Sequence, residues 1–416
     1  MQRSRLQSAL VAVVLVSTAG CGGSHSGSGV RVSVDRPVAL RDVPLRITVT
    51  GLHPHERAAL RATSRDQLGT PTGIRAGTQF VSSTPIRANS AGRVDLRGDA
   101  AMRVLWSLRP VGVGAGTAAF SLLPPSSGEV VSLTVDGARA TIRRLDVAPG
   151  VRRRSIRHPF YGEFFAPPTH TRRPGVLLFG GSEGGLSTSG IAQLYASHGY
   201  PTLALAYFAE PGLPRTLDRI PLEYFAGALR WLRRQPGVDP AKLAVEGISR
   251  GSEAAQLLGV HYPRFVHAVI AMVPANGAGC GIRPYYSRGG GGACISPYAW
   301  TYRGRPIPSG SGPYTPFPFH DERTNGPIFL DCAGTDQLWE SCPMAQAIVS
   351  RLRAHRFKHQ VTFLQYPKAG HGVGDLVPNS DYGNTPLDGW STYSNDRAAA
   401  DGWPKLLGFL RSFSRS

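Results

Sequence analysis

The most informative motif of this chain is Gly247-Ile248-Ser249-Arg250-Gly251. It follows a short apolar run at residues 243–245 and precedes a helical stretch rich in small residues, 252–260. A strand, the pattern G-x-S-x-G and a helix together are typical of a nucleophile elbow, in which a strained turn lifts the serine hydroxyl above the sheet. The two glycines let strand and helix approach closely. The stretch therefore predicts a nucleophile at Ser249, and its partners must lie further along the chain.

A serine hydroxyl needs a base to take its proton and a carboxylate to orient that base. In hydrolases of this kind the acid precedes the histidine, and both lie on loops after strands. Asp336 follows an apolar run at residues 328–330, and His371 lies between two glycines after the run 361–364. We predict Ser249, Asp336 and His371 as a catalytic triad.

Other acids and histidines fit these roles less well. Asp331 lies nearer its strand and is expected to be buried against a backbone donor, and Asp375 lies beyond the histidine. His355 and His359 lie on or beside an amphipathic helix and are expected at the surface.

Hydrolysis through a serine also requires two N–H donors for the oxyanion. The backbone amide of Arg250, directly after the nucleophile, is the first candidate. The second is expected from the loop 180–185, with the sequence Gly-Gly-Ser-Glu-Gly-Gly. The sequence leaves open whether Gly181 or Ser182 donates. The loop lacks the G-x-G-x-x-G spacing of a dinucleotide cradle, so no nucleotide cofactor is expected.

A change of hydrophobic period divides the chain into two domains. From residue 30 to about 150 apolar residues alternate with polar ones, as in Val131, Leu133 and Val135, which predicts an antiparallel β-sandwich. Trp106 is expected there as a core residue or an interdomain anchor. From 151 to 416 apolar runs alternate with helical periods, which predicts an α/β-hydrolase domain with a mostly parallel sheet.

The chain begins with an export signal. Arg3 and Arg5 precede a short apolar core at residues 9–16, and small residues then lead into Cys21. The segment resembles a bacterial lipoprotein signal, although Thr18 departs from the usual aliphatic residue and leaves ordinary secretion open. We expect a signal peptide at 1–20, a lipid on Cys21 and a flexible tether at 21–29. The protein is then an envelope lipoprotein, alternatively a secreted protein.

The charge composition limits which partners the protein is expected to bind. The 46 lysines and arginines against 27 acids give a net charge of +19, but the arginines are scattered and form no nucleic-acid module. We expect a basic surface suited to an anionic envelope and no nucleic-acid partner.

The four cysteines after Cys21 favour disulfides in an exported protein, and the local pairs Cys280–Cys294 and Cys332–Cys342 are preferred. Their spacing matches no usual zinc site, so no metal is expected.

These motifs resemble the acyl-CoA thioester hydrolase and bile acid-CoA:amino acid N-acyltransferase family over nearly the whole mature chain. The similar stretches are residues 102–110, 179–186, 203–208, 221–225, 247–251, 336–339 and 366–371. The resemblance implies an immunoglobulin-like N-terminal domain before an α/β-hydrolase domain. It also implies Ser249, Asp336 and His371 as nucleophile, acid and base.

Two departures from the family shape the expected function. The transferase branch uses a cysteine nucleophile, so Ser249 favours hydrolysis over transfer to an amine. Known members act mostly on coenzyme A thioesters inside cells, whereas this chain carries an export signal. We expect a serine acyl hydrolase that cleaves an acyl thioester or ester. The alternatives are transfer of the acyl group to an envelope amine or alcohol, and a ligand-binding lipoprotein without turnover.

One long insertion fits a minimal fold poorly. Residues 275–325 are rich in glycine, proline and tyrosine and contain Cys280 and Cys294. Loops of this length are usually functional or disordered. We expect a lid over the acyl pocket, pinned by a disulfide. The alternative interpretation, a surface loop without a function, is left open by the sequence.

Overall fold

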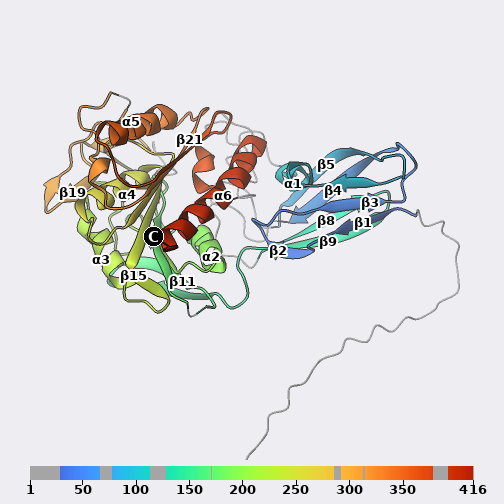
Figure 1. Ribbon diagram of the computed structural model, residues 1–416, viewed down its shortest axis with the longest axis horizontal. Coiled ribbons are helices and arrows are strands. Elements are labelled where there is room, and N and C mark those ends of the chain that lie inside the picture. The colour runs from blue at the N-terminus through green and yellow to red at the C-terminus, as the bar shows by residue number, and fades with distance from the viewer. Residues whose placement is uncertain are drawn as a thin grey trace, which may run out of the picture.

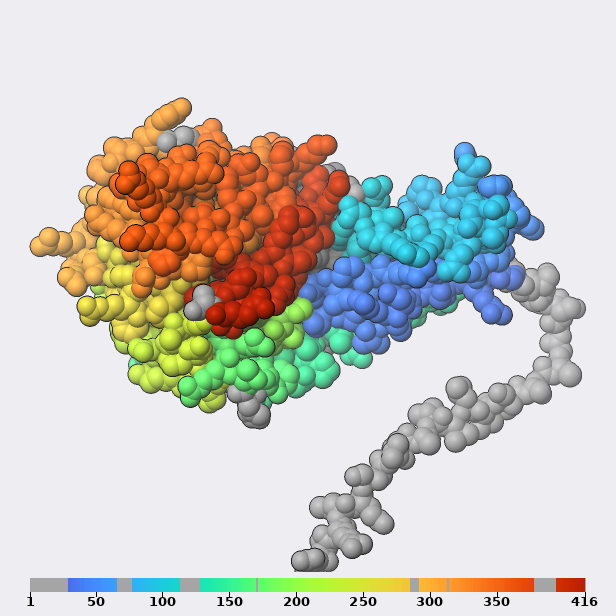
Figure 2. Space-filling view, in the orientation of Figure 1, coloured from blue at the N-terminus to red at the C-terminus, as the bar shows by residue number. Residues whose placement is uncertain are grey.

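A computed structural model of the protein describes residues 29–65, 77–112, 128–169, 171–284, 292–312, 314–377 and 392–415. The predicted signal peptide, the lipidation site Cys21 and the tether up to residue 28 lie outside these ranges. Figures 1 and 2 show a smaller β domain beside a larger α/β domain. In the described ranges, none of the helices has the length and apolar character needed to cross a bilayer.

The N-terminal domain consists of two β-sheets. The smaller sheet has the order β1(Arg31–Val34), β3(Ile47–Thr50), β6(Val94–Leu96). The larger has the order β2(Val38–Leu40), β9(Ala138–Leu145), β8(Glu129–Val135), β4(Arg57–Arg65), β5(Gln79–Arg87), β7(Arg109–Pro110). Alternate residues of the longer strands point into the domain core, as the period of two predicts. Helix α1(Asp99–Trp106) closes this core, and Trp106 is buried in it, which confirms the predicted core position.

The second domain is built on an eight-stranded sheet. Its order is β10(Arg152–Ile156), β11(Tyr161–Ala166), β13(Thr202–Ala206), β12(Arg173–Phe179), β15(Val238–Ile248), β16(Ala268–Met272), β21(Ile328–Ala333), β22(Val361–Tyr366). Strand β11 runs antiparallel to both of its neighbours, β10 and β13, and all other neighbouring strands of this sheet are parallel. The strand order, with β13 before β12, and the elbow after β15 identify the predicted α/β-hydrolase fold.

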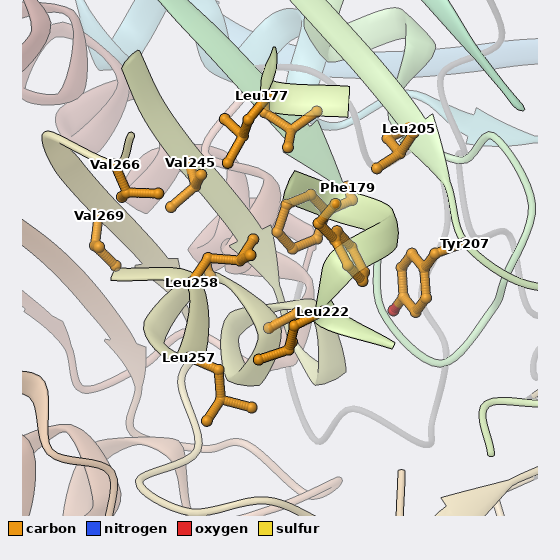
Figure 3. Close-up of a cluster of buried hydrophobic side chains, with 14 of the residues drawn as sticks. Leu177, Phe179, Leu205, Tyr207, Leu222, Val245, Leu257, Leu258, Val266 and Val269 are labelled. Atoms are coloured by element: carbon orange, nitrogen blue, oxygen red, sulfur yellow. The ribbon is translucent and has the colours of Figure 1, made fainter. Parts of the chain in front are cut away.

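Helices cover both faces of this sheet (Figure 1). On one face lie α3(Leu222–Leu232), α4(Arg250–His261) and α5(Ser341–Ala354), packed on a core that Figure 3 shows around Leu177, Val245 and Leu258. On the other lie α2(Ser189–Ser197) and α6(Thr392–Arg415). Since both faces are covered, the central strands are mostly apolar, and the chemistry is expected at the carboxyl edge where the loops emerge.

The first two strands of this sheet were not predicted. β10 is a charged edge strand with four of its five residues exposed, so the arginines 152–154 conceal it in the sequence. β11 lies in a proline-rich passage, and its residues are buried by packing that the local sequence does not reveal.

The two domains contact each other through a buried carboxylate. Asp42 of the β domain accepts the indole N–H of Trp403 in α6 (2.8 Å) and meets Nε2 of His198 after α2 (2.6 Å). Burial alone would raise the pKa of Asp42. The hydrogen bond and the charge of His198 have the larger effect, so the pKa of Asp42 lies below its usual value. The contact fixes the helices on one face of the catalytic sheet to the N-terminal domain.

Candidate active site

Ser249 occupies the tight turn that its sequence predicts. Its backbone has φ 55° and ψ −123°, between the end of β15 and the first residue of α4. A Cβ atom on Gly247 would lie 2.1 Å from the carbonyl oxygen of Gly251, and one on Gly251 would lie 2.3 Å from that of Gly180. Both glycines are therefore required by close backbone approach, and the strained turn presents the serine side chain at the carboxyl edge of the sheet.

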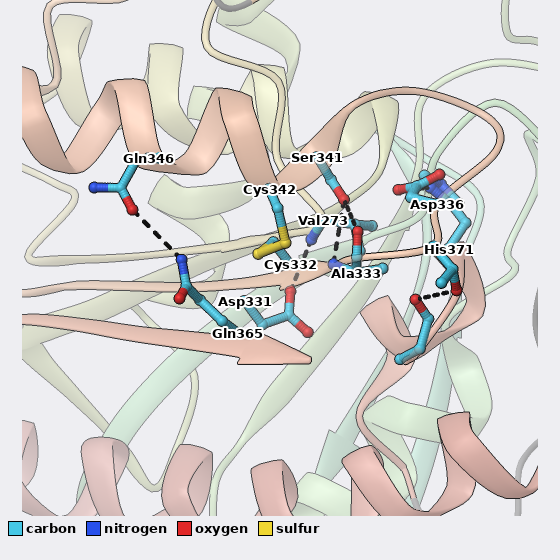
Figure 4. The surroundings of a disulfide bond; sticks show 12 residues. Val273, Asp331, Cys332, Ala333, Asp336, Ser341, Cys342, Gln346, Gln365 and His371 are labelled. Atoms are coloured by element: carbon cyan, nitrogen blue, oxygen red, sulfur yellow. Dashed lines mark hydrogen bonds and ion pairs between the residues drawn. A yellow bond between two sulfur atoms is a disulfide. The ribbon is translucent and has the colours of Figure 1, made fainter. Parts of the chain in front are cut away.

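The structure brings the three predicted triad residues together. His371 Nε2 lies 2.8 Å from Ser249 Oγ, and His371 Nδ1 lies 2.8 Å from Asp336 Oδ2. Figure 4 shows His371 beside Asp336. The histidine and aspartate side chains are only 5% and 1% exposed. In the tautomer with its proton on Nδ1, His371 binds Asp336 and leaves Nε2 free to accept the serine proton.

Asp336 is held as a carboxylate by its surroundings. Its Oδ1 atom accepts the backbone N–H groups of Leu338 (3.0 Å) and Trp339 (3.2 Å), which leaves Oδ2 for the histidine. Burial would raise the pKa of Asp336, but His371 and these hydrogen bonds lower it below its usual value. The acid is thus ionised and oriented before substrate arrives.

The rejected acid, Asp331, lies in a different environment. It is fully buried in β21 and accepts the backbone N–H of Val273 at 2.7 Å, as the sequence led us to expect. Burial raises its pKa to about 7. His355 and His359 are exposed, which confirms their predicted surface positions.

The two candidate donors in the loop after β12 are not equivalent. The N–H of Gly181 donates to the carboxylate of Glu183 at 2.8 Å, so this amide already has an acceptor. The backbone N–H of Ser182, the next residue, therefore remains the candidate for the second oxyanion donor. Arg250 is the first residue of α4, and the amides of a first helical turn have no acceptor within the helix. The geometry thus favours Arg250 and Ser182 over Gly181 as oxyanion donors.

Glu183 fixes this loop, a role that the sequence analysis missed. The same carboxylate oxygen also accepts the hydroxyl of Ser187 (2.5 Å). From the other side, the hydroxyl of Tyr207 donates to the carbonyls of Gly180 (2.9 Å) and Gly181 (3.1 Å). A Cβ atom on Gly181 would lie 2.8 Å from Ser249 Cβ, which shows how closely the loop approaches the nucleophile.

A second carboxylate that the sequence analysis missed joins the elbow helix to the insertion 275–325. Glu253 in α4 is fully buried and accepts the indole N–H of Trp300 (2.6 Å) and the backbone N–H of Gly279 (3.0 Å). It also pairs with Arg250 Nε at 2.7 Å, and the same guanidinium donates to the Cys280 carbonyl (2.8 Å). The insertion is thus bound to the residue that follows the nucleophile.

Within the insertion, the described residues form short regular elements rather than an open loop. These are β17(Gly281–Ile282), β18(Cys294–Ser296), β19(Trp300–Tyr302), β20(Arg305–Pro306) and the 3-10 helix Asp321–Arg323. Strand β19 also pairs with β14(Ile220–Pro221), which directly precedes α3.

Both preferred disulfides are present. Cys280 is bonded to Cys294, which ties β17 to β18 inside the insertion. Cys332 is bonded to Cys342, which closes the loop that carries Asp336 between the end of β21 and the start of α5 (Figure 4). In the described part of the chain, no three histidine, cysteine or acidic side chains are grouped to hold a metal.

Comparisons with known proteins agree with the two-domain arrangement. Residues 42–158 match the family described as the acyl-CoA thioester hydrolase/BAAT N-terminal region. Residues 220–287 and 307–413 match the BAAT / acyl-CoA thioester hydrolase C-terminal family. The gap between these last two segments lies inside the insertion.

Individual relatives cover most of the chain. Acyl-coenzyme A thioesterase 6 of Mus musculus is 27% identical over 89% of this chain and 94% of its own. Bile acid-CoA:amino acid N-acyltransferase of the same organism is 31% identical over 57% of this chain and 60% of its own. Among solved structures, an α/β hydrolase from a deep-sea metagenome library is 19% identical, with a TM-score of 0.43 over 65% of this chain and 100% of that one.

Proposed function

The chain belongs to the acyl-CoA thioester hydrolase and bile acid-CoA:amino acid N-acyltransferase family, and from this premise we propose that it hydrolyses acyl thioesters through an acyl-serine on Ser249. One observation carries the proposal: His371 contacts Ser249 Oγ with one ring nitrogen and Asp336 with the other, each at 2.8 Å. A surface serine in a binding protein has no need for such an arrangement, whereas a serine nucleophile depends on it.

The reaction has two steps. His371 Nε2 takes the proton of Ser249 as Oγ attacks the acyl carbonyl, and the amides of Arg250 and Ser182 stabilise the resulting oxyanion. The carbon–sulfur bond then breaks, the acyl group stays on Oγ, and the leaving sulfur takes the proton from the His371 imidazolium, so that the product departs as a thiol and the imidazole is neutral again. Water next attacks the acyl-serine while His371 takes its proton, the bond between the acyl carbon and Oγ breaks, and the imidazolium returns the proton to Ser249 Oγ as the carboxylic acid is released.

The insertion contributes a fixed wall to this site. The Glu253 contacts to Gly279 and Trp300 hold it on the elbow helix, and Trp300 is fully buried. We therefore propose that the described residues of the insertion cover the acyl group, as expected for a lid held on the elbow helix.

The remaining assignments concern the setting of the enzyme. We propose that the two-sheet N-terminal domain is an immunoglobulin-like sandwich of the family type. We also propose that residues 1–20 direct export and that Cys21 carries a lipid, so that the enzyme is anchored at the outer side of the cell membrane, or is secreted if Cys21 is not modified.

A hydrolysis panel tests the function. Acyl-CoA thioesters and oxyesters of matched chain lengths are given to the wild type and to Ser249→Ala, with and without an added amine such as glycine. We expect free acid and thiol from the wild type, and a fall in turnover of about six orders of magnitude in the variant. Formation of amide in the presence of glycine would favour the transferase alternative. Binding of acyl-CoA without any release of thiol would favour a ligand-binding lipoprotein.

A further inference from the structure

The larger sheet of the N-terminal domain presents a face with positive charge only. Strand pairing places Arg57 of β4 opposite Arg87 of β5, and Arg61 of β4 opposite Thr134 of β8, which in turn pairs with Arg139 of β9. Directly paired residues share one face of a sheet. This arginine face comprises six exposed side chains: Arg57, Arg61, Arg65, Arg87, Arg139 and Arg143.

No carboxylate neutralises this face. The other outward positions on these four strands are alanine, threonine, serine, glutamine, proline and valine. None of the six arginines forms an ion pair with any residue that the structure describes. The smaller sheet differs, because there Asp95 pairs with both Arg46 and Arg97, each at 2.7 Å.

The face combines this charge with exposed apolar side chains. Val38, Val81 and Val130 are 60%, 38% and 49% exposed, and they account for three of the eight large hydrophobic side chains that are exposed in the described residues. Val38 and Val130 each pair with Arg143. Like charges directly opposite each other, as at Arg57 and Arg87, destabilise a sheet unless anions cover them. The face is therefore suited to an anionic partner with an apolar layer beneath its charges.

We propose that the arginine face binds the surface of a bilayer that contains anionic phospholipids. The outward side of a six-stranded sheet is a broad surface, whereas protein segments that read duplex DNA enter its grooves. Arginines near an anionic leaflet gain attraction individually, and short apolar side chains enter the headgroup region.

The start of the chain is compatible with this orientation. The segment that precedes Gly29 enters the same domain, at β1. Eight residues after Cys21 span at most about 28 Å, which exceeds the roughly 10 Å between two packed sheets. A lipid on Cys21 would thus reach a membrane on the side of the arginine face.

Vesicle sedimentation tests the proposal on the full chain with Cys21→Ser, which carries no lipid. The vesicles contain phosphatidylcholine alone or with about one third phosphatidylglycerol, at physiological ionic strength. The face variant carries R57Q, R61Q, R87Q and R143Q. Its matched control carries R172Q, R234Q, R264Q and R353Q, which removes the same charge from exposed positions of the catalytic domain. Far-UV circular dichroism and thioester turnover of both variants verify folding.

The expected result is binding to anionic vesicles only, at least 100-fold weaker in the face variant and within about threefold of the parent in the control. Raising the salt to 1 M should release the parent protein, since it shortens the screening length to about 3 Å. The proposal is overturned if the parent does not bind anionic vesicles, or if both variants lose binding equally. It is also overturned if the face variant loses affinity for duplex DNA but not for vesicles.

Discussion

The carboxylate of Glu183 accepts the backbone N–H of Gly181 at 2.8 Å, in the loop that contacts the nucleophile Ser249. Because this bond already gives the Gly181 amide an acceptor, we propose that Ser182 supplies the second oxyanion donor. Glu183 thus acts on the reaction through the loop backbone, as a positioning residue.

Replacement of Glu183 should impair turnover more than substrate binding. Glu183→Ala removes the acceptor for both Gly181 and Ser187, so we expect kcat to fall about 100-fold, the scale of losing one oxyanion donor, with a smaller change in KM. Glu183→Gln keeps an acceptor oxygen at the same place and should retain kcat within about fivefold. Steady-state kinetics on one acyl-CoA substrate measure both.

A nearby carboxylate provides the control for this prediction. Glu210 accepts the N–H of Leu186 at 3.3 Å, at the far end of the same loop. Glu210→Ala should leave kcat within about threefold of the wild type. An equal loss in Glu210→Ala and Glu183→Ala would show that general loosening of the loop, not the position of Ser182, accounts for the effect.

The two buried aspartates after β16 should differ sharply in their effect on turnover. Asp336→Asn leaves a side chain that cannot hold the productive tautomer of His371, and we expect a loss of about 10⁴ in kcat. Asp331→Asn keeps an oxygen for the Val273 amide and should reduce kcat less than threefold. If the two variants lost activity equally, Asp336 would not be the orienting acid.

The contacts of the triad could be predicted because each partner follows a strand of a parallel sheet. The carboxyl ends of β15, β21 and β22 meet at one edge, so Ser249, Asp336 and His371 converge whatever the details of the loops. The elbow could also be recognised from its local sequence, because close backbone contacts require glycine at positions 247 and 251.

Glu183 and Glu253 could not be predicted in the same way. Glu183 binds the backbone N–H of a residue two positions away, and a glutamate in a glycine-rich loop looks equally suited to solvent. Glu253 lies on a helix, and its partners Trp300 and Gly279 belong to an insertion whose path the sequence does not specify. In both cases the partners are backbone groups or distant residues, for which residue pattern gives no signal.

The Cys332–Cys342 disulfide should matter for activity as well as for stability. It closes the loop that carries Asp336, and Cys332 is fully buried. Replacing both cysteines by alanine should lower the free energy of unfolding by about 2–3 kcal/mol and reduce kcat at least tenfold. The matched pair Cys280→Ala/Cys294→Ala should lose similar stability but keep kcat within about threefold. Equal kinetic loss in both pairs would contradict a specific role for the Asp336 loop.

A buried glutamate should make the protein less stable as the pH rises. Glu246 in β15 accepts the hydroxyl of Tyr195 at 2.6 Å, and burial raises its pKa to about 8. The pKa of Glu246 is higher in the folded state than in the unfolded state, so the folded state binds the proton more tightly. The resulting contribution to the free energy of unfolding is complete below about pH 4.5 and is lost as the pH rises to about 8.

Urea unfolding of Glu246→Gln across this range measures the effect. The variant should lose less stability than the wild type toward pH 8, by a difference on the order of 2–4 kcal/mol. Parallel curves for the two proteins would show that Glu246 does not titrate in this window.

Labelling of Ser249 by a fluorophosphonate tests the central claim most directly, because the probe reacts only with a serine that a neighbouring base has activated. The folded wild type should be modified at one site, which peptide mass spectrometry locates at Ser249, and prior incubation with acyl-CoA should slow the reaction. Ser249→Ala should remain unlabelled, and His371→Ala should react far more slowly. Equal labelling of the wild type and Ser249→Ala, or modification of a different serine, would contradict the account.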